Sequence, residues 1–431
     1  MSLRTRNKRL LSAAAATVAL SGLLAGCGGK GGSDGGSGSK VVVWYLWGGP
    51  EGQALDAVIQ DFNASQKQYV VEGLSVPDEQ KIKVAIAGGN GPDLTDSFSS
   101  NVAPYAEQGI ALPLDDLIAR DKYNMDDFLP AAAEAGKYKG KVYALPLNVS
   151  FSMMYYNKKL LAEAGFKEPP KTSKELMDVA IKTTKTRPDG TIEVLGSPQY
   201  PSDKFLFGPL AYGFGTNWVS KDATRFTFDA PSTLEAFRFI YEYNKRFGAD
   251  NVKRVQASGK WLDPNDPFFM GKQAIRFDGP WMSAQMKSKN INVDYGIAPL
   301  PYLDGKPETA GGGENSSSVF YIAKTAKNKE GAWAFMKFLY EPKNLAKFLS
   351  VLGNVPAQKA ALDEPAMKSM PDYDKIMELS KSANLRSTPN YAKQIDFGKI
   401  VEDELDQVTF LKKTPEEAVK SLSDRSKDLL K

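Results

Sequence analysis

The 431-residue sequence contains no histidine and a single cysteine, Cys27. The absence of histidine excludes Ser-His-Asp and Cys-His catalysis, imidazole metal ligation and the usual near-neutral proton shuttle. A lone thiol forms neither a disulfide within the chain nor a cysteine-rich metal site. Of the common hydrolytic designs, mainly a pair of carboxylates remains. We therefore expect no metal and no cofactor.

The chain also has little net charge beyond its first residues. The formal net charge of +4 equals the contribution of Arg4, Arg6, Lys8 and Arg9, which no acidic residue accompanies there. The rest of the chain is therefore close to neutral and exerts no long-range attraction on nucleic acid. We expect no nucleic-acid partner.

The first 26 residues have the architecture of an export signal. The basic residues precede an apolar stretch from Leu10 to Leu24, and small residues follow. Leu24-Ala25-Gly26-Cys27 resembles the lipobox of bacterial lipoproteins. The resemblance implies cleavage before Cys27 and acylation of its sulfur and new amino terminus, for example with palmitate. Such a protein is anchored on the extracytoplasmic face of the cell membrane. A secretory signal with an accidental cysteine, or an uncleaved anchor, is the alternative.

Residues 27–40 begin with the lipidated cysteine and continue almost entirely in Gly, Ser and Lys. About a dozen such residues form a random coil with an end-to-end distance of roughly 20 Å. We interpret this segment as a tether that holds a folded body near the membrane. A Gly-x-Ser-x-Gly match over 31–35 has no strand before it and no helix after it, so we attribute it to chance.

Strands and helices alternate after the tether, which predicts a parallel α/β sheet. The first expected elements are a strand over 41–47, a helix with Leu55, Val58, Ile59 and Phe62 on one face, a strand over 69–76, a helix over 79–87 and a strand over 94–98.

The pattern restarts near residue 141, and at this chain length two or more domains are expected. The further expected strands cover 141–145, 152–157, 273–277 and 293–297. The further expected helices cover 158–164, 205–214, 232–247, 281–288, 328–340, 343–352 and 397–411, with others beginning at the capping boxes of Thr172 and Thr414.

Five blocks of sequence follow one another in a characteristic order: 88–94 (GGNGPDL), 140–146 (GKVYALP), 155–166 (YYNKKLLAEAGF), 269–281 (FMGKQAIRFDGPW) and 332–339 (AWAFMKFL). In this order they resemble the extracellular solute-binding proteins of ABC importers, in the carbohydrate-binding branch that includes maltodextrin-binding proteins. The resemblance covers nearly all of the chain after the tether.

The resemblance implies an α/β fold of two doubly wound lobes joined by hinge crossings, the type II periplasmic-binding-protein-like fold. Ligands of such sheets bind beyond the carboxyl ends of the strands, so two facing lobes enclose a ligand cleft. We expect the N-lobe to comprise residues 40–148 and 305–354, and the C-lobe residues 150–303 and 356–431.

The resemblance also implies a function. It predicts a monomeric, lipid-anchored protein, not an enzyme, that captures a sugar, and specifically an oligosaccharide, by hinge closure. Its partners would be the carbohydrate ligand, the permease subunits of an ABC importer, and the membrane through the lipid at Cys27.

A sugar ring has an apolar face that aromatic rings cover and hydroxyls that carboxylates and amides bind. Trp47 ends the first strand and is either a cleft residue or a core residue. Glu51 is either a hydroxyl acceptor or a charge favoured at a helix N-terminus. Ser97 and Ser99 follow a strand end where the family contacts ligand. Ser97 and Ser150 align with an aromatic platform and an acid of maltodextrin binders, which argues against their particular sugar.

In the expected C-lobe, Trp281 matches a stacking tryptophan of the family. Asp278, just before it, is either a hydroxyl acceptor or the cap of the next helix. Phe207 lies in a segment that resembles an aromatic ligand contact, or else in a helix core.

Two further ligand contacts are expected near the crossings. Gly312 and Gly313 belong to a glycine-rich loop whose amides face ligand in the family, because glycine permits close backbone approach. A plain flexible crossing is the alternative. Arg386 resembles an arginine near the hinge, and a surface arginine is the alternative.

Two other functions stay open. A carboxylate-dependent glycoside hydrolase would draw on Asp115-Asp116, Asp126-Asp127 or Glu402-Asp403-Glu404. Neighbouring carboxylates do not face each other across one substrate bond as the reaction requires, so we expect these acids on the solvated surface. A binding protein for a non-sugar solute such as a peptide is the second alternative.

Overall fold

The computed structural model describes residues 38–198, 203–220, 222–228, 231–386 and 388–430. Cys27, the predicted leader and most of the predicted tether lie outside these residues. The residues from Gly38 onward form one compact unit. Among the helices that are described, none combines the length and the apolar character needed to cross a membrane.

The first sheet has five strands in the order β2-β1-β3-β14-β6. The predicted parallel arrangement is confirmed for β1 with β2 and β3. β14 comes from much later in the chain and is antiparallel to both β3 and β6. The strands are β1 (Ser39–Tyr45), β2 (Tyr69–Ser75), β3 (Leu94–Phe98), β6 (Leu145–Pro146) and β14 (Ser318–Ile322).

Helices pack on this sheet through apolar faces. The predicted face of the first helix is confirmed, because Leu55, Val58, Ile59 and Phe62 are its large buried residues. The helices of this part are α1 (Gly49–Ser65), α2 (Glu79–Ala87), α3 (Val102–Glu107), α4 (Asp115–Asp121), α5 (Pro130–Ala133), α12 (Lys329–Leu339) and α13 (Pro342–Leu352).

The second sheet has three strands in the order β11-β8-β12. β8 is antiparallel to both neighbours, so β11 and β12 run in the same direction. The strands are β8 (Met153–Asn157), β11 (Ile275–Asp278) and β12 (Tyr295–Ala298). The accompanying helices are α6 (Lys158–Glu163), α7 (Ser173–Thr183), α8 (Asp203–Gly213), α9 (Pro231–Phe247), α10 (Ala249–Gln256), α11 (Trp281–Ser288), α16 (Gln394–Thr409) and α17 (Pro415–Ser426).

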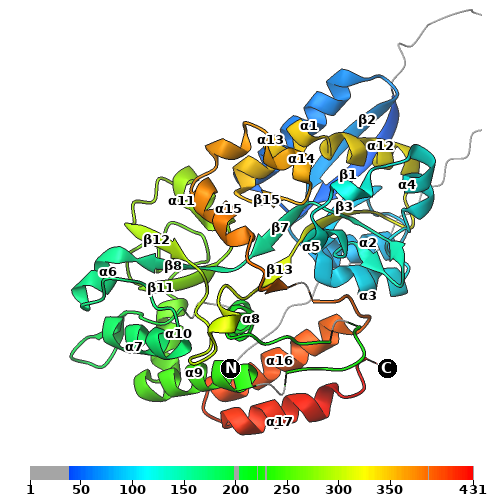
Figure 1. Ribbon diagram of the computed structural model, residues 1–431. Coiled ribbons are helices and arrows are strands. Elements are labelled where there is room, and N and C mark those ends of the chain that lie inside the picture. Colours follow the sequence, from blue (N-terminus) through cyan, green and yellow to red (C-terminus); the bar gives the residue numbers. More distant parts are fainter. Residues whose placement is uncertain (1–37, 199–202, 221, 229–230, 387, 431) are drawn as a thin grey trace, which may run out of the picture. The chain divides into compact units, whose positions relative to one another are not determined.

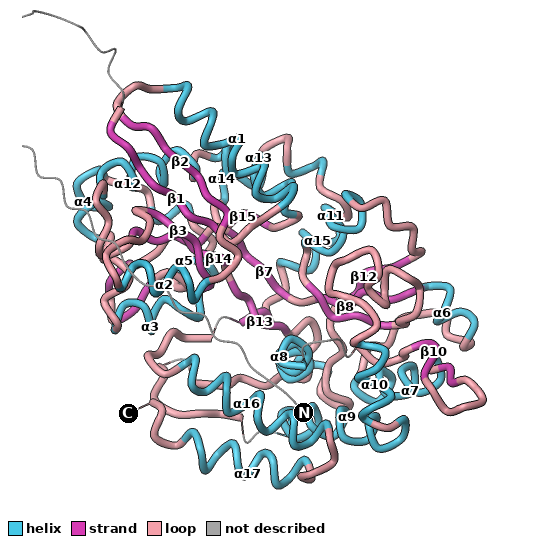
Figure 2. Tube along the Cα trace, turned by 180° about the vertical axis from the view of Figure 1, so that it is seen from behind, coloured by secondary structure: helices cyan, strands magenta, loops and turns pink. Residues whose placement is uncertain are grey.

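A small central sheet connects the two larger ones, with the order β15-β7-β13-β16. The chain passes from β6 through β7 to β8, and it returns from β12 through β13 to β14. Figures 1 and 2 show β7 and β13 between the strands of the first and second sheets. These strands are β7 (Asn148–Phe151), β13 (Gly313–Ser316), β15 (Val355–Pro356) and β16 (Leu385–Arg386).

The remaining elements are short. They are β4 (Lys137–Tyr138), β5 (Lys141–Val142), β9 (Lys185–Thr186), β10 (Ile192–Val194), α14 (Lys359–Leu362), α15 (Tyr373–Ser380) and the 3-10 helices η1 (Ser99–Asn101), η2 (Met125–Asp127), η3 (Pro307–Thr309) and η4 (Met367–Ser369).

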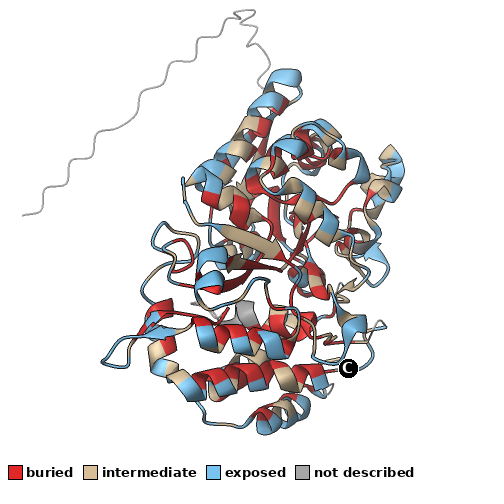
Figure 3. Cartoon of the chain, turned by 60° about the vertical axis from the view of Figure 1, so that its left-hand side comes forward, coloured by how far each residue is buried: buried red, intermediate tan, exposed pale blue. Residues whose placement is uncertain are grey.

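The described buried apolar residues form two large clusters and a smaller one. The first cluster surrounds the first sheet and also takes in Met153 and Tyr155 of β8, and the second packs on the second sheet. Figure 3 shows that the helices turn buried residues inward and exposed residues outward. The first cluster includes Ala361, Met367 and Ile376, which follow the third crossing. The segment around α14, η4 and α15 therefore packs in the first cluster, where α14 and η4 contact α13, although it lies within the range expected for the C-lobe.

Asp93 of the Pro-Asp block ties distant segments of the first sheet together. Its carboxylate accepts hydrogen bonds from the backbone nitrogens of Val42 at 2.8 Å, Lys327 at 2.6 Å and Asn328 at 2.9 Å. A buried carboxylate needs such donors, because an unpaired buried charge is strongly unfavourable. The block therefore has a structural role in the first sheet.

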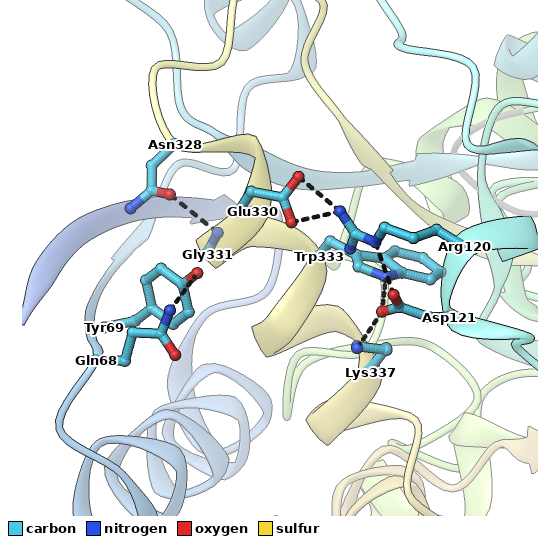
Figure 4. Close-up of polar contacts among 9 residues, drawn as sticks. All are labelled: Gln68, Tyr69, Arg120, Asp121, Asn328, Glu330, Gly331, Trp333 and Lys337. Carbon is cyan, nitrogen blue, oxygen red and sulfur yellow. Dashed lines mark hydrogen bonds and ion pairs between the residues drawn. The ribbon is translucent and has the colours of Figure 1, made fainter. Parts of the chain in front are cut away.

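A polar cluster fastens α12 to α4 (Figure 4). The Asp121 carboxylate accepts hydrogen bonds from Arg120 Nε at 2.7 Å, Trp333 Nε1 at 2.9 Å and Lys337. Arg120 Nη1 also donates to both carboxylate oxygens of Glu330, each at 2.9 Å. The Arg120 hydrogen bond, followed by those of Lys337 and Trp333, lowers the pKa of Asp121 well below its ordinary value. The stability from this ionised carboxylate is therefore lost only in strong acid.

Glu404 corrects the expectation that the late acidic run is solvated. Its side chain is 1% exposed and joins α16 to α17. It accepts hydrogen bonds from Lys413 at 2.7 Å, Ser421 at 2.7 Å and Arg425 at 2.8 Å. Burial raises the pKa of Glu404, but these three donors outweigh burial and hold the pKa below its ordinary value of 4.5. Asp403, beside it, is exposed as expected.

Replacing Glu404 with glutamine is expected to destabilise the protein by roughly 1–3 kcal/mol at pH 7, because hydrogen bonds to a buried charge weaken. A folded-state pKa below the unfolded one gives stability that is present at neutral pH and lost as the pH falls below about 4.5. Urea unfolding of both proteins should therefore show a gap at pH 7 that shrinks in acid. Asp403→Asn, at the exposed neighbour, is the control and should change stability less.

Candidate ligand cleft

A cleft of about 2370 Å³ lies between the carboxyl end of β3 and the elements of the second sheet. On the first side its lining comes from α2, η1, α3 and the β4–β5 hairpin. On the other side the lining comes from α8, residues 217–220 and 223–227, the turn after β11 and α16. β13 contributes Glu314, Asn315 and Ser316 where the chain crosses.

A buried polar cluster holds a carboxylate at the first wall. Glu79 lines the cleft, and its Oε1 accepts hydrogen bonds from Ser97 Oγ and from Asn101 Nδ2 at 2.8 Å. Asn101 Nδ2 also donates to Ser97 Oγ at 3.0 Å. Burial and then the Glu79 charge raise the pKa of Tyr105, which stays a neutral donor. This arrangement holds a carboxylate, an amide and a phenol in fixed positions on the cleft wall.

Trp281 lines the opposite wall, as the sequence predicts for a ligand contact. Its ring folds back over Gly279, where an added Cβ would lie 2.3 Å from the ring carbons Cη2 and Cζ3. Glycine is therefore required for this packing. The Trp281 Nε1 donor is buried and has no hydrogen-bond partner among the described residues.

Asp278 also lines the cleft, but its two oxygens already have donors. Oδ1 accepts from Gly279 N at 2.9 Å, and Oδ2 accepts from Trp261 Nε1 at 2.9 Å. Burial raises the pKa of Asp278, and the charge of Arg276 opposes this effect. The alternative role as cap of α11 is wrong, because that helix starts after Pro280 with no side-chain cap.

A carboxylate on β13 faces the cleft from the crossing. Glu314 Oε1 accepts hydrogen bonds from Tyr212 Oη and Thr388 Oγ1, both at 3.0 Å. Burial raises the pKa of Glu314. The glycines just before it do not line the cleft. Gly312 is buried, and an added Cβ there would lie 2.7 Å from the Tyr212 carbonyl oxygen, so close packing explains that glycine. Gly313 is buried as the first residue of β13.

Among the other predicted contacts, Ser99 and Arg386 line the cleft. Ser99 Oγ accepts from Ser317 N at 3.3 Å. Arg386 is exposed, and its backbone pairs with Glu314.

The remaining predicted contacts lie outside the cleft lining, each with partners of its own. Trp47 packs against Phe320 and Phe348, with ring centroids 5.9 and 5.3 Å apart. Glu51 accepts from Gln285 Nε2 at 2.8 Å, and burial raises its pKa.

Ser97 and Ser150 are also buried away from the cleft lining. Ser97 is 1% exposed and supports Glu79, and Ser150 donates to Asn354 Oδ1 at 3.1 Å. Phe207 is fully buried between Phe237 and Trp218, at centroid distances of 4.3 and 5.7 Å.

The family model for bacterial extracellular solute-binding proteins matches residues 57–375 of the chain. The chain belongs to this family. The family predicted from the five sequence blocks is therefore confirmed. A maltotriose-binding protein of Pyrococcus abyssi is 31% identical over 340 residues, which are 77% of this chain and 69% of the relative.

Solved structures agree in fold with this solute-binding protein. CpMnBP1 with mannotriose bound is 26% identical, with a TM-score of 0.80, and the match covers 90% of this chain and 100% of that one. The sugar-binding protein MalE of Xanthomonas citri, 20% identical with a TM-score of 0.72, covers 91% and 97% and shows the fold alone. The predicted type II α/β fold is confirmed. A binding protein for sn-glycerol 3-phosphate from Escherichia coli, 24% identical over 91% of the chain and 93% of the relative, is also similar.

Proposed function

We propose that this protein captures an oligosaccharide in its cleft and delivers it unaltered to the permease of an ABC importer. The size and chemistry of the cleft carry the proposal. Sites for single small molecules measure about 300–1,000 Å³, and a volume near 2370 Å³ suits a longer ligand. Fixed hydroxyl-binding groups and aromatic rings line the cleft together, which matches the two kinds of surface of a sugar.

Relatives support carbohydrate as the ligand. One relative binds maltotriose, and a solved structure of the same fold holds mannotriose. Both are trisaccharides, in keeping with a cleft larger than one ring requires. The membership in a family of binding proteins supports capture without catalysis. A glycoside hydrolase is the alternative, and shortened sugar after incubation would favour it.

The three connections of the central sheet are proposed as the hinge between an N-lobe and a C-lobe, near residues 148–153, 303–318 and 354–356. Contacts across the cleft support a closed arrangement. Asn390 Nδ2 donates to the carbonyl oxygens of Ala135 at 3.2 Å and Lys137 at 3.0 Å. α16 also lies against η1 and α3. Ligand contacts to both lobes would favour this arrangement over an open one.

Closure predicts a change in size. In small-angle X-ray scattering, the ligand-free protein is expected to be more extended than the structure described above, because it lacks the ligand contacts that would hold both lobes together. A saturating oligosaccharide should contract it to that structure. A scattering curve that stays the same while calorimetry shows saturation would contradict hinge closure.

The membrane anchor is a separate part of the proposal. The export signal and the cysteine that follows support a lipoprotein held on the extracytoplasmic face of the membrane. A monomer on this tether would hand its ligand to permease subunits in the same membrane.

A thermal-shift screen tests the ligand class. The panel should contain malto- and manno-oligosaccharides, their monosaccharides, sn-glycerol 3-phosphate and a mixed tripeptide. A ligand at 100 times its dissociation constant adds about 2.7 kcal/mol of stability. We expect the largest shift with an oligosaccharide. A shift with the tripeptide or the phosphate alone would overturn the proposal.

A further inference from the structure

Two aromatic side chains are conspicuously exposed in the part of the chain that the structure describes. Among its large hydrophobic residues classed as exposed, the aromatic ones are Phe98 at 51% and Trp261 at 42%. Both line the cleft. Phe98 is the last residue of β3 in the first sheet, and Trp261 lies in the loop between α10 and β11 of the second sheet.

Single exposed apolar residues are common and need no explanation. Two exposed aromatic rings in one concave site, contributed from the two sides, are a different observation. Aromatic rings bury 150–250 Å² each when covered, so a ligand that covers both gains a large contact area. A ligand with apolar faces and a polar rim suits such a pair, because the rim can bind the carboxylates and hydroxyls nearby.

Trp261 is held in place although its ring is exposed. Its Nε1 donates to Asp278 Oδ2 at 2.9 Å, and the same oxygen accepts from Arg276 Nε at 3.2 Å. Asp278 Oδ1 is fixed by Gly279 N. The indole therefore loses little further freedom when a ligand stacks on it, which is an advantage for affinity.

The loop that carries Trp261 is fixed by the same buried network. Arg276 is fully buried and pairs with Asp266, its NH1 lying 3.2 Å from Oδ1. Asp266 in turn accepts from Leu262 N at 3.1 Å and from Phe268 N at 2.9 Å. Through Asp266, the buried guanidinium therefore joins β11 to the segment 262–268 that follows Trp261. A bidentate guanidinium is suited to this, because its donors have a fixed planar geometry.

We propose that Phe98 and Trp261 form a sugar-stacking subsite with one platform on each wall of the cleft, and that Arg276 positions the Trp261 platform through Asp278 and Asp266. This inference rests on the proposed function, and it names the residues that recognise the apolar faces of the oligosaccharide.

Calorimetric titration with the oligosaccharide of largest thermal shift tests the subsite. Phe98→Ala and Trp261→Ala are each expected to weaken binding about tenfold or more. Trp261→Phe keeps an aromatic face but loses the hydrogen bond to Asp278, so an intermediate loss is expected. Met270→Ala is the matched control, because Met270 lies in the same loop, is 54% exposed and does not line the cleft.

Fluorescence gives a second measurement that folding defects do not imitate. Saturating sugar should shift the tryptophan emission of the wild type, and part of that shift should vanish in Trp261→Phe. Arg276→Lys should make Trp261 more accessible to acrylamide before any ligand is added, whereas the Met270 variant should not.

The outcomes separate this inference from the proposed function. If the folded wild type binds no carbohydrate, both fail. If the wild type binds an oligosaccharide while Phe98→Ala and Trp261→Ala bind it equally well, the subsite is overturned and the proposed function stands. Unchanged quenching of Trp261 in Arg276→Lys would overturn the positioning role.

Discussion

Replacement of Trp281 by alanine is expected to weaken oligosaccharide binding by about 1–4 kcal/mol, the range of central aromatic contacts in binding sites. The loss has one main physical source, because the indole supplies a large rigid face that a sugar ring can cover. Its Nε1 is buried and has no hydrogen-bond partner among the described residues. Isothermal titration calorimetry gives the affinity directly.

The control for this variant is Leu411→Ala, because Leu411 is 40% exposed and does not line the cleft. Trp281→Phe should retain part of the stacking and lose the donor. The melting temperature of each variant must first show that it is folded. Wild-type affinity in folded Trp281→Ala would show that this tryptophan is not a ligand contact.

Replacement of Cys27 by alanine is expected to abolish lipid attachment completely. The chain has no second cysteine, so an alkyne-labelled fatty acid on a cysteine sulfur can mark this position alone. A single acyl chain gives marginal membrane binding and stable anchoring takes two, so acylation of both the sulfur and the amino terminus predicts firm retention. The measurement is label incorporation in a bacterial host, with mass spectrometry of the mature amino terminus.

A displaced cysteine provides the control for position. The double variant Cys27→Ala, Ser33→Cys keeps one thiol in the tether but removes it from the lipobox, and it should remain unlabelled. Label on this variant, or a mature chain that does not begin at Cys27 in the wild type, would contradict the lipoprotein prediction.

Much of the fold follows from local patterns in the sequence. The helices predicted over 79–87 and 281–288 coincide with α2 and α11. The capping box at Thr414 forms as predicted, with Thr414 and Glu417 bonded reciprocally. At Thr172 only half of it forms, because Glu175 reaches the backbone of Lys171 instead. The direction of strand pairing was harder to predict, because β14 and β8 pair with strands that lie far from them in the sequence.

The candidate site was less predictable for a physical reason. Trp281 lies in a turn with a family pattern, and the structure places it in the cleft. Trp47 and Phe207 are aromatic residues in equally suggestive segments, but Trp47 is half-buried against Phe348 and Phe207 is fully buried against Phe237. Sequence spacing does not report which side of an aromatic residue stays uncovered.

Residues that the sequence reasoning missed depend on contacts between distant positions. Glu79 reads as the first residue of a helix, and only its hydrogen bonds with Ser97 and Asn101 mark it as a cleft group. Trp261 lies in an irregular loop without periodicity, and its partner Asp278 is 17 residues away. The sequence signal that could have identified Trp261 was the presence of a tryptophan in an otherwise polar loop.

The most direct test of reversible oligosaccharide capture is a calorimetric titration of the purified protein with maltotriose and mannotriose, followed by chromatography of the recovered sugar. The proposal predicts saturable one-to-one binding of at least one trisaccharide, which is released at its original length. Folded protein that gives no binding heat with either sugar and no thermal shift with any oligosaccharide, or that returns shortened products, would contradict it.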